Sequence, residues 1–161
     1  MEVFDIEIPA HSTRREWAVY AIIAKHITIN KTKIYVGKVG DNREGCNPII
    51  SRIGNHFSHN KIHSQLRNLI VSTTDYNYKV YYATFGEYSL ITQKRDKDRV
   101  NELERQLNRL IQSNIANEKN IELLNPYKGK SVSKAIQIKR QELLTEKEIK
   151  TLEFLAKKAT D

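Results

Sequence analysis

Three short segments of the chain have the hydrophobic and aromatic pattern of β-strands. Residues 17–24 form an almost unbroken apolar run, Trp-Ala-Val-Tyr-Ala-Ile-Ile-Ala, which predicts a buried strand. A polar loop at 28–33 leads to a second strand at 34–39, as in a hairpin. Residues 76–85 alternate between two faces and form a third strand. We therefore expect a small three-stranded antiparallel sheet.

Helical spacing follows the second strand. Residues 40–47 have the composition of a loop, and Pro48 suits the first turn of a helix that Asn47 would cap. From that point, apolar residues recur at the interval of a helix, at Ile50, Ile53 and Phe57. A second short helix is expected at 64–71.

Further helices follow the third strand. Residues 92–114 predict a charged helix with an inward apolar stripe of Val100, Leu103, Leu107, Leu110 and Ile111. Asn-Pro-Tyr at 125–127 interrupts the pattern, and two more helices are expected at 132–144 and 146–159, the second opened by a Thr145 to Glu148 capping box. Their apolar side indicates a docked extension or a dimer contact.

These elements predict an α+β fold in which helices flank a small sheet. The 161 residues suffice for one domain with a core of its own. We expect an N-terminal arm or edge strand at 1–16, a core at 17–127 and a helical extension at 128–161.

Charge adds a class of partner to this picture. The chain has 27 Lys and Arg residues against 19 Asp and Glu, a net charge of +8, which favours a polyanionic partner. On charge alone, a basic protein with a solvated surface explains the excess equally well. The single cysteine, Cys46, excludes an intramolecular disulfide and a cysteine-rich zinc site. The sequence has no signal-peptide pattern and no apolar run of about 18 residues, so we expect a cytoplasmic protein without a membrane span.

A few polar residues interrupt the apolar pattern where chemistry is possible. Tyr20 and Tyr35 lie in the middle of the first two strands, and Arg52 and His56 are one turn apart on the same side of the first helix. Glu104 lies at the margin of the stripe of the long helix, whereas Glu102 is expected to point away. An arginine fork binds phosphate, and one carboxylate suits Mg²⁺ or another divalent cation such as Mn²⁺. These residue types fit phosphodiester hydrolysis, which needs charge neutralisation, a positioned water and a proton acceptor.

In order and kind, four motifs resemble the GIY-YIG nuclease superfamily. They are Val-Tyr-Ala at Tyr20, Tyr-Val-Gly at Tyr35, Arg52 followed by His56, and the helical Glu104. The first motif has Val19 and Ala21 where the family has Gly and Ile, and the second has Val36 where it has Ile. The resemblance spans residues 17–111 and implies a Mg²⁺-dependent endonuclease acting on double-stranded DNA.

The resemblance also implies a role for each residue. Tyr20 would be the general base, with Arg52 and Lys38 favouring its phenolate, and Tyr35 would orient water or phosphate. His56 would contact phosphate or relay a proton, and Glu104 would hold the metal ion. Lys38, directly after Gly37, resembles the compact restriction-enzyme branch. For the asparagine found after the glutamate helix in this family, Asn125 is the candidate, and Asn114, Asn117 and Asn120 compete with it.

Sequence readout would have to come from basic and amide side chains outside the catalytic motifs. The candidates for DNA contact are Arg43, Asn60, Lys61, Gln65, Arg67, Asn125, Lys134, Gln137 and Arg140. A palindromic target would call for a twofold homodimer. We expect no small-molecule cofactor.

Three alternatives stay open at this point. His56, His59 and His63 suggest a zinc cluster or an HNH-type metal finger, although the metal-site pattern of that unit is missing. The same chemistry would also serve a structure-selective repair, homing or mobile-element nuclease instead of a type II restriction-like enzyme. The altered first motif leaves room for a catalytically silent nucleic-acid-binding module.

Overall fold

A four-stranded mixed sheet forms the middle layer of the molecule. The computed structural model describes residues 2–40, 46–128 and 133–161. The strand order is β3-β1-β2-β4, and β1 (Glu16–His26) pairs antiparallel with both β2 (Thr32–Val39) and β3 (Tyr76–Glu87). The α+β class and the antiparallel core of three strands match the expectation. The predicted strand count was wrong, because β4 (Ile121–Leu123) adds a parallel strand beside β2. Three residues are too few to show a strand period in the sequence.

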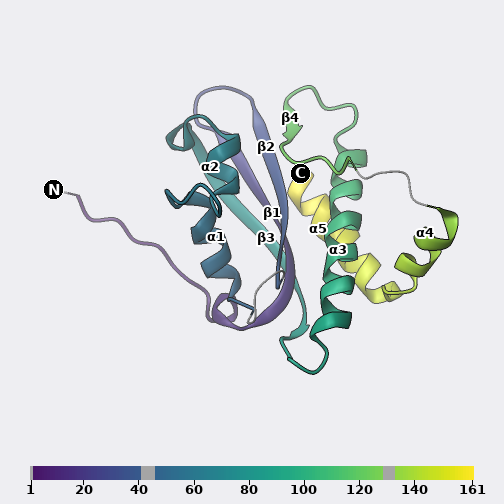
Figure 1. The fold of residues 1–161 in the computed structure, drawn as a ribbon. Helices are drawn as coiled ribbons and strands as arrows, with labels where there is room; N and C mark the ends of the chain where they lie inside the picture. The colour runs from purple at the N-terminus through teal and green to yellow at the C-terminus, as the bar shows by residue number, and fades with distance from the viewer. Residues whose placement is uncertain (1, 41–45, 129–132) are drawn as a thin grey trace.

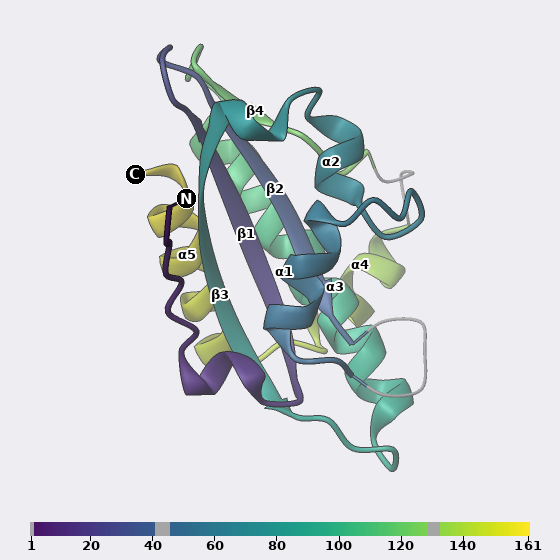
Figure 2. The ribbon, with the colours of Figure 1, turned by 90° about the vertical axis from the view of Figure 1, so that its left-hand side faces the viewer.

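Helices cover both faces of this sheet (Figures 1 and 2). On one face lie α1 (Ile49–Phe57) and α2 (Gln65–Leu69), and on the other lie α3 (Gln93–Asn114) and α5 (Glu146–Thr160). The short α4 (Lys134–Gln141) lies beyond α3, at the edge of the molecule. Short 3-10 turns at Ala10–Thr13 (η1) and Thr73–Asp75 (η2) complete the described elements.

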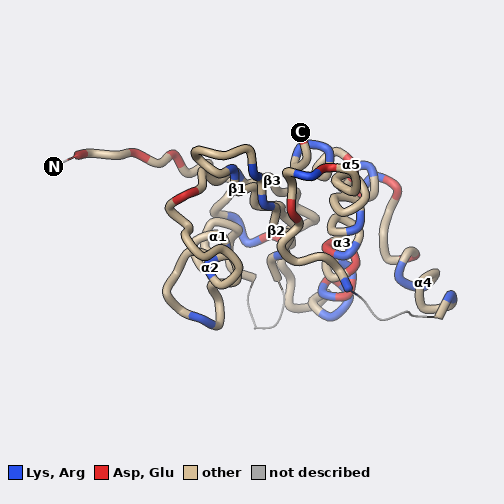
Figure 3. Tube along the Cα trace, turned by 90° about the horizontal axis from the view of Figure 1, so that it is seen from above, with Lys and Arg blue, Asp and Glu red and all other residues tan. Residues whose placement is uncertain are grey.

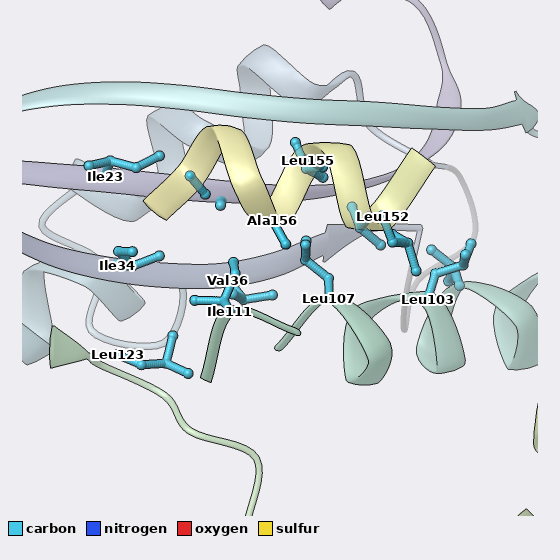
Figure 4. Close-up of a cluster of buried hydrophobic side chains, with 14 of the residues drawn as sticks. Ile23, Ile34, Val36, Leu103, Leu107, Ile111, Leu123, Leu152, Leu155 and Ala156 are labelled. Atoms are coloured by element: carbon cyan, nitrogen blue, oxygen red, sulfur yellow. The ribbon is translucent and has the colours of Figure 1, made fainter. Parts of the chain in front are cut away.

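The central strand β1 explains why the sequence there is apolar at almost every position. Its side chains alternate between two hydrophobic clusters, so both faces of the strand are buried. Trp17, Val19, Ala21 and Ile23 face α3 and α5, whereas Ala18, Tyr20, Ile22 and Ala24 face α1 and α2. Figure 4 shows how leucines and isoleucines of α3 and α5 close the first cluster over β1 and β2.

The last helix belongs to this core. Leu152, Leu155 and Ala156 of α5 are buried against α3 and the sheet, and the predicted capping box at Thr145 and Glu148 is present. α3 therefore meets both the sheet and the C-terminal helices, and its buried face is wider than its apolar stripe. For this reason the expectation that Glu102 points away was wrong: Glu102 is 2% exposed and pairs with Arg105 at 2.6 Å.

One local expectation also differs from the structure: helix α1 begins at Ile49 with Pro48 as its N-cap residue and without a side-chain cap, so Asn47 does not cap it. Residues 2–9 form an arm that pairs with no described strand of its own chain. The arm extends away from the body of the molecule (Figure 1). Among the described helices, none has the length and apolar character to cross a lipid bilayer.

Candidate active site

Tyr20 and Tyr35 point to the same face of the sheet, towards α1. In the antiparallel register Tyr20 pairs with Gly37, two residues beyond Tyr35, so the two tyrosines are diagonal neighbours. Gly37 leaves the space that the Tyr20 ring occupies, since a Cβ at this position would lie within 3 Å of three atoms of that ring. The Tyr-Val-Gly motif therefore seats the first tyrosine as well as carrying the second.

Helix α1 brings His56 against both tyrosines. The Tyr20 hydroxyl and His56 Nε2 are 2.6 Å apart, and the His56 ring lies edge-on to Tyr35 with ring centroids 4.7 Å apart. Tyr20 and His56 are fully buried. Arg52, one turn earlier on α1, hydrogen-bonds the Tyr20 side chain. The structure thus brings together four residues predicted from the sequence: Tyr20, Tyr35, Arg52 and His56.

Burial decides the protonation of this group. It lowers the pKa of His56 to about 4, with a smaller contribution from the positive charge of Arg52, so the imidazole is neutral at pH 7. Burial also raises the pKa of Tyr20 far above its usual value of 10, although Arg52 acts in the opposite direction. Arg52 therefore favours the phenolate of Tyr20 as expected, but burial outweighs it in the free protein. Tyr20 is a neutral phenol, and we assign its hydroxyl as the donor to the unprotonated Nε2 of His56.

Lys38 and Glu104 meet on the opposite side of β2. Because Lys38 follows Gly37 in the strand, it faces α3, where its Nζ lies 2.7 Å from Glu104 Oε2. The negative charge of Glu104 contributes to the raised pKa of Tyr20, so the carboxylate lies within electrostatic reach of the tyrosine. Of the described strands, β4 pairs only with Thr32 to Ile34 of β2, and the end of β2 near Lys38 has no further strand beside it. The two groups of residues therefore lie on opposite faces of the sheet, and Lys38 and Glu104 lie beside this open edge of β2.

An open cleft adjoins Glu104. Its volume is about 440 Å³, and Lys38, Asn101, Glu104, Arg105, Asn108, Asn125, Pro126, Tyr127 and Lys128 line it. Asn108 shapes this wall, because its buried amide donates to the Asn125 carbonyl at 2.9 Å and accepts from the Tyr127 amide at 2.8 Å. Sequence reasoning missed Asn108, Arg105 and Tyr127. The only sequence signal for the burial of Asn108 is that it directly follows Leu107, a residue of the apolar stripe.

Asn125 has a role that the sequence did not show. Its Oδ1 accepts from the Val36 amide at 3.0 Å, and its Nδ2 donates to the Val36 carbonyl at 2.7 Å. The side-chain amide thus replaces a neighbouring strand at the edge of β2. Asn125 holds the strand that carries Tyr35 and Lys38, and its predicted contact with DNA stays a prediction.

The remaining DNA-contact candidates lie in two separate regions (Figure 1). Asn60, Lys61, Gln65 and Arg67 belong to α2 and the loop before it, and the Arg67 guanidinium donates to the Phe57 carbonyl at 3.2 Å. Lys134, Gln137 and Arg140 lie on α4, across the sheet and α3 from that region. Arg43 lies outside the described residues.

The residues present fit one divalent cation. Mg²⁺ is often bound through one carboxylate together with water and substrate phosphate oxygens, and Glu104 offers a carboxylate, 28% exposed, on an open cleft. A multi-ligand centre is a poorer fit, since no group of three or more His, Cys, Asp or Glu in the described parts of the chain is arranged to hold a metal ion. The burial of His56 against Tyr20 also weighs against a zinc cluster with His59 and His63.

Comparisons of the chain with protein-family models, with curated proteins and with solved structures find no match. The functional interpretation therefore depends on the side chains and their geometry.

Proposed function

We propose that the chain is a divalent-cation-dependent DNA endonuclease of the GIY-YIG type. The observation that carries this proposal is the contact of Tyr20 with His56 within electrostatic reach of Glu104. A hydroxyl in contact with a neutral imidazole can exchange protons, and the Glu104 carboxylate with the basic residues Arg52 and Lys38 suits a phosphodiester. Residues from β1, β2, α1 and α3 supply these groups.

In the proposed reaction, Tyr20 moves the proton of the attacking water. The water proton passes to the Tyr20 oxygen as the Tyr20 proton passes to His56 Nε2, and the resulting hydroxide forms a new bond to phosphorus while the bond to the leaving oxygen breaks. Arg52 stabilises the negative charge on the phosphate. Tyr35 orients the water or phosphate, and Lys38 adds positive charge next to Glu104. A divalent cation held by Glu104 supplies electrostatic stabilisation of the phosphate and of the leaving oxygen.

Within this class we propose a sequence-specific, type II restriction-like enzyme, following the resemblance of the motif around Lys38. A restriction enzyme cuts plasmid DNA into discrete fragments. A repair or mobile-element nuclease would instead nick branched or damaged DNA.

The test is cleavage of plasmid DNA by the purified chain with Mg²⁺. We expect Tyr20→Phe, Arg52→Ala and Glu104→Gln each to lower the cleavage rate by about 100-fold or more, because each removes proton transfer or charge stabilisation. Tyr82→Phe is the matched control for Tyr20, since Tyr82 is its partner across β1 and β3 and has an equally buried hydroxyl. Glu153→Gln, on the exposed side of α5, is the control for Glu104.

Unchanged cleavage by the three site variants would contradict the proposed roles. Salt-sensitive DNA binding without cleavage at any Mg²⁺ or Mn²⁺ concentration would instead identify a catalytically silent binding module.

A further inference from the structure

The arm of residues 2–9 exposes four large apolar side chains to solvent, which is unfavourable for a free segment in water. Val3, Phe4 and Ile6 are 97%, 83% and 87% exposed, and Ile8 is 52% exposed. In an extended chain Phe4, Ile6 and Ile8 lie on one face, while Asp5 and Glu7 lie on the other with Val3. The arm therefore has the pattern of a β-strand with one apolar face and one mainly acidic face.

The outer edge of β3 has no strand paired with it among the described residues. β3 is 12 residues long and lies at the end of the sheet, where it pairs with β1 and, among the described strands, with no other. Tyr78, Val80 and Tyr82 on its α1 face are only half-buried. A long unpaired edge is a ready template for strand addition, and folded proteins usually cover it.

The two surfaces are complementary in polarity and charge. On the α5 face of β3, Lys79 is exposed and lines a hollow of about 100 Å³ together with Lys25, Lys158 and Asp161. A strand added to β3 continues the alternation of the sheet. If its Phe4, Ile6 and Ile8 cover the tyrosine side, its Asp5 and Glu7 face the lysine side. Residues 2–13 contain no Lys or Arg that would oppose this pairing. In Figure 3 the charged segments of the arm are all acidic.

We infer that this arm adds as a strand to the outer edge of β3 in a second copy of the chain. The arm leaves its own body at η1, where His11 stacks on Tyr82 with ring centroids 5.7 Å apart, and then runs away from its own sheet (Figure 1). Eight extended residues span about 26 Å, enough to cover most of β3 in a neighbour. Reciprocal exchange of two arms closes a twofold dimer without leaving an arm free. The dimer forms whether or not the chain cleaves DNA.

The first test is the mass of the full chain in solution as a function of concentration, by sedimentation equilibrium. We expect a dimer, and we expect the double variant Phe4→Asp, Ile6→Asp to raise its dissociation constant by about 100-fold or more, because each arm loses two buried apolar side chains. Val3→Asp is the matched control: it adds a charge to the same arm, but on the acidic face, and should leave the dimer intact. A chain that is monomeric at all accessible concentrations, or a dimer that the double variant does not weaken, would overturn the inference.

The second test identifies the acceptor strand. A carbodiimide joins a carboxylate to a lysine amine in direct contact, so Asp5 or Glu7 should be joined to Lys79. In a mixture of ¹⁵N-labelled and unlabelled protein, the joined peptides should combine one labelled and one unlabelled partner. Peptides of uniform label only would show that the arm folds back onto its own β3, and a dimer without this junction would show a different interface. Either result contradicts the exchange of arms.

Discussion

For Tyr20 and His56, burial has a larger effect on protonation than the charge of the neighbouring Arg52 does. Both side chains are fully buried and face each other at 2.6 Å, so the phenol hydroxyl and His56 Nε2 satisfy one another, whereas the buried His56 Nδ1 has no hydrogen-bond partner among the described residues. In the proposed reaction this pair accepts a proton from water only when substrate phosphate and a metal ion have changed the local charge. In the free protein the proton acceptor, the imidazole of His56, is therefore neutral at any pH well above 4.

This arrangement predicts an acid-sensitive stability. The pKa of His56 is about 4 in the folded chain and about 6.5 when unfolded, so between these values only the unfolded chain binds the proton and the folded state loses stability as the pH falls. At pH 4.5 the wild type should have lost roughly 2 to 3 kcal/mol that the variant His56→Gln retains. Urea unfolding at pH 7 and pH 4.5 measures this difference.

The control for this prediction is His59→Gln, since His59 is exposed. Its unfolding should change with pH as the wild type does. Equal pH dependence in His56→Gln and the wild type would show that the pKa of His56 is the same in the folded and unfolded chain, so that burial does not lower it.

The types and order of the site residues were predictable from the sequence, and their electrostatics were not. Tyr20, Tyr35, Arg52 and His56 lie together because strand alternation and helical spacing place them on facing surfaces. The depth of Tyr20 depends on α1 and on the space above Gly37, which no local pattern contains. Likewise, the contact of Asn125 with Val36 joins positions 89 residues apart, so only the packed fold shows it.

At the scale of elements, Glu148 joins the C-terminal helix to the rest of the core. Thr145 donates to it in the capping box, and the Arg99 guanidinium from α3 forms an ion pair with it and also donates to the Phe85 carbonyl of β3. Burial opposes the ionisation of Glu148, but these hydrogen bonds outweigh it and lower the pKa of the carboxyl. One carboxylate thus links α5, α3 and β3.

Replacement of this carboxylate should destabilise the fold. We expect Glu148→Gln to lower the free energy of unfolding by about 1 to 3 kcal/mol, because Arg99, three-quarters buried, would lose its closer charged partner and keep only the longer pair with Asp96 at 3.8 Å. Glu146→Gln on the same helix removes an exposed pair with Lys150 and should cost at most about 0.5 kcal/mol. Thermal unfolding of both variants measures the contrast. Equal melting temperatures would show that the network around Arg99 adds no net stability.

The elements themselves were mostly evident from local patterns. The strands β1, β2 and β3 and the helix α3 have long, consistent periods, whereas β4 is defined only by its pairing with Thr32, Lys33 and Ile34. The boundary at residue 128 followed a break in composition, but packing depends on apolar side chains and not on such breaks. As a result, α5 shares a hydrophobic cluster with β1 and α3.

At the scale of the whole molecule, positive and negative charges are interspersed along α3 (Figure 3), and the net charge of +8 is not confined to one helix. Near the candidate site, the positive side chains are Lys38, Arg52, Arg105 and Lys128. Together these four residues can neutralise about three to four phosphates of one DNA segment. The two groups of DNA-contact candidates, on α2 and on α4, lie on opposite sides of the sheet and α3 (Figure 1).

Duplex binding should therefore depend steeply on salt. Neutralisation of three to four phosphates predicts a loss of roughly 40- to 150-fold in affinity between 50 and 200 mM salt. Arg105→Ala and Lys128→Ala should each flatten the slope of log affinity against log salt by about 0.9, whereas Lys150→Ala, on α5 away from the cleft, should not. Fluorescence anisotropy with a labelled duplex measures these slopes. Binding that is insensitive to salt would contradict a phosphate contact at the cleft.

The close fit of Gly37 under Tyr20 has a consequence for evolution. Any side chain at position 37 would displace the aromatic ring at position 20, so position 37 can gain a side chain only after the ring is lost. A descendant that lost the tyrosine would be free to gain bulk at position 37, and a return to tyrosine would then be blocked by that bulk. Loss of the ring followed by a larger residue at position 37 would therefore be hard to reverse. A lineage that made both changes would retain the fold without recovering the chemistry.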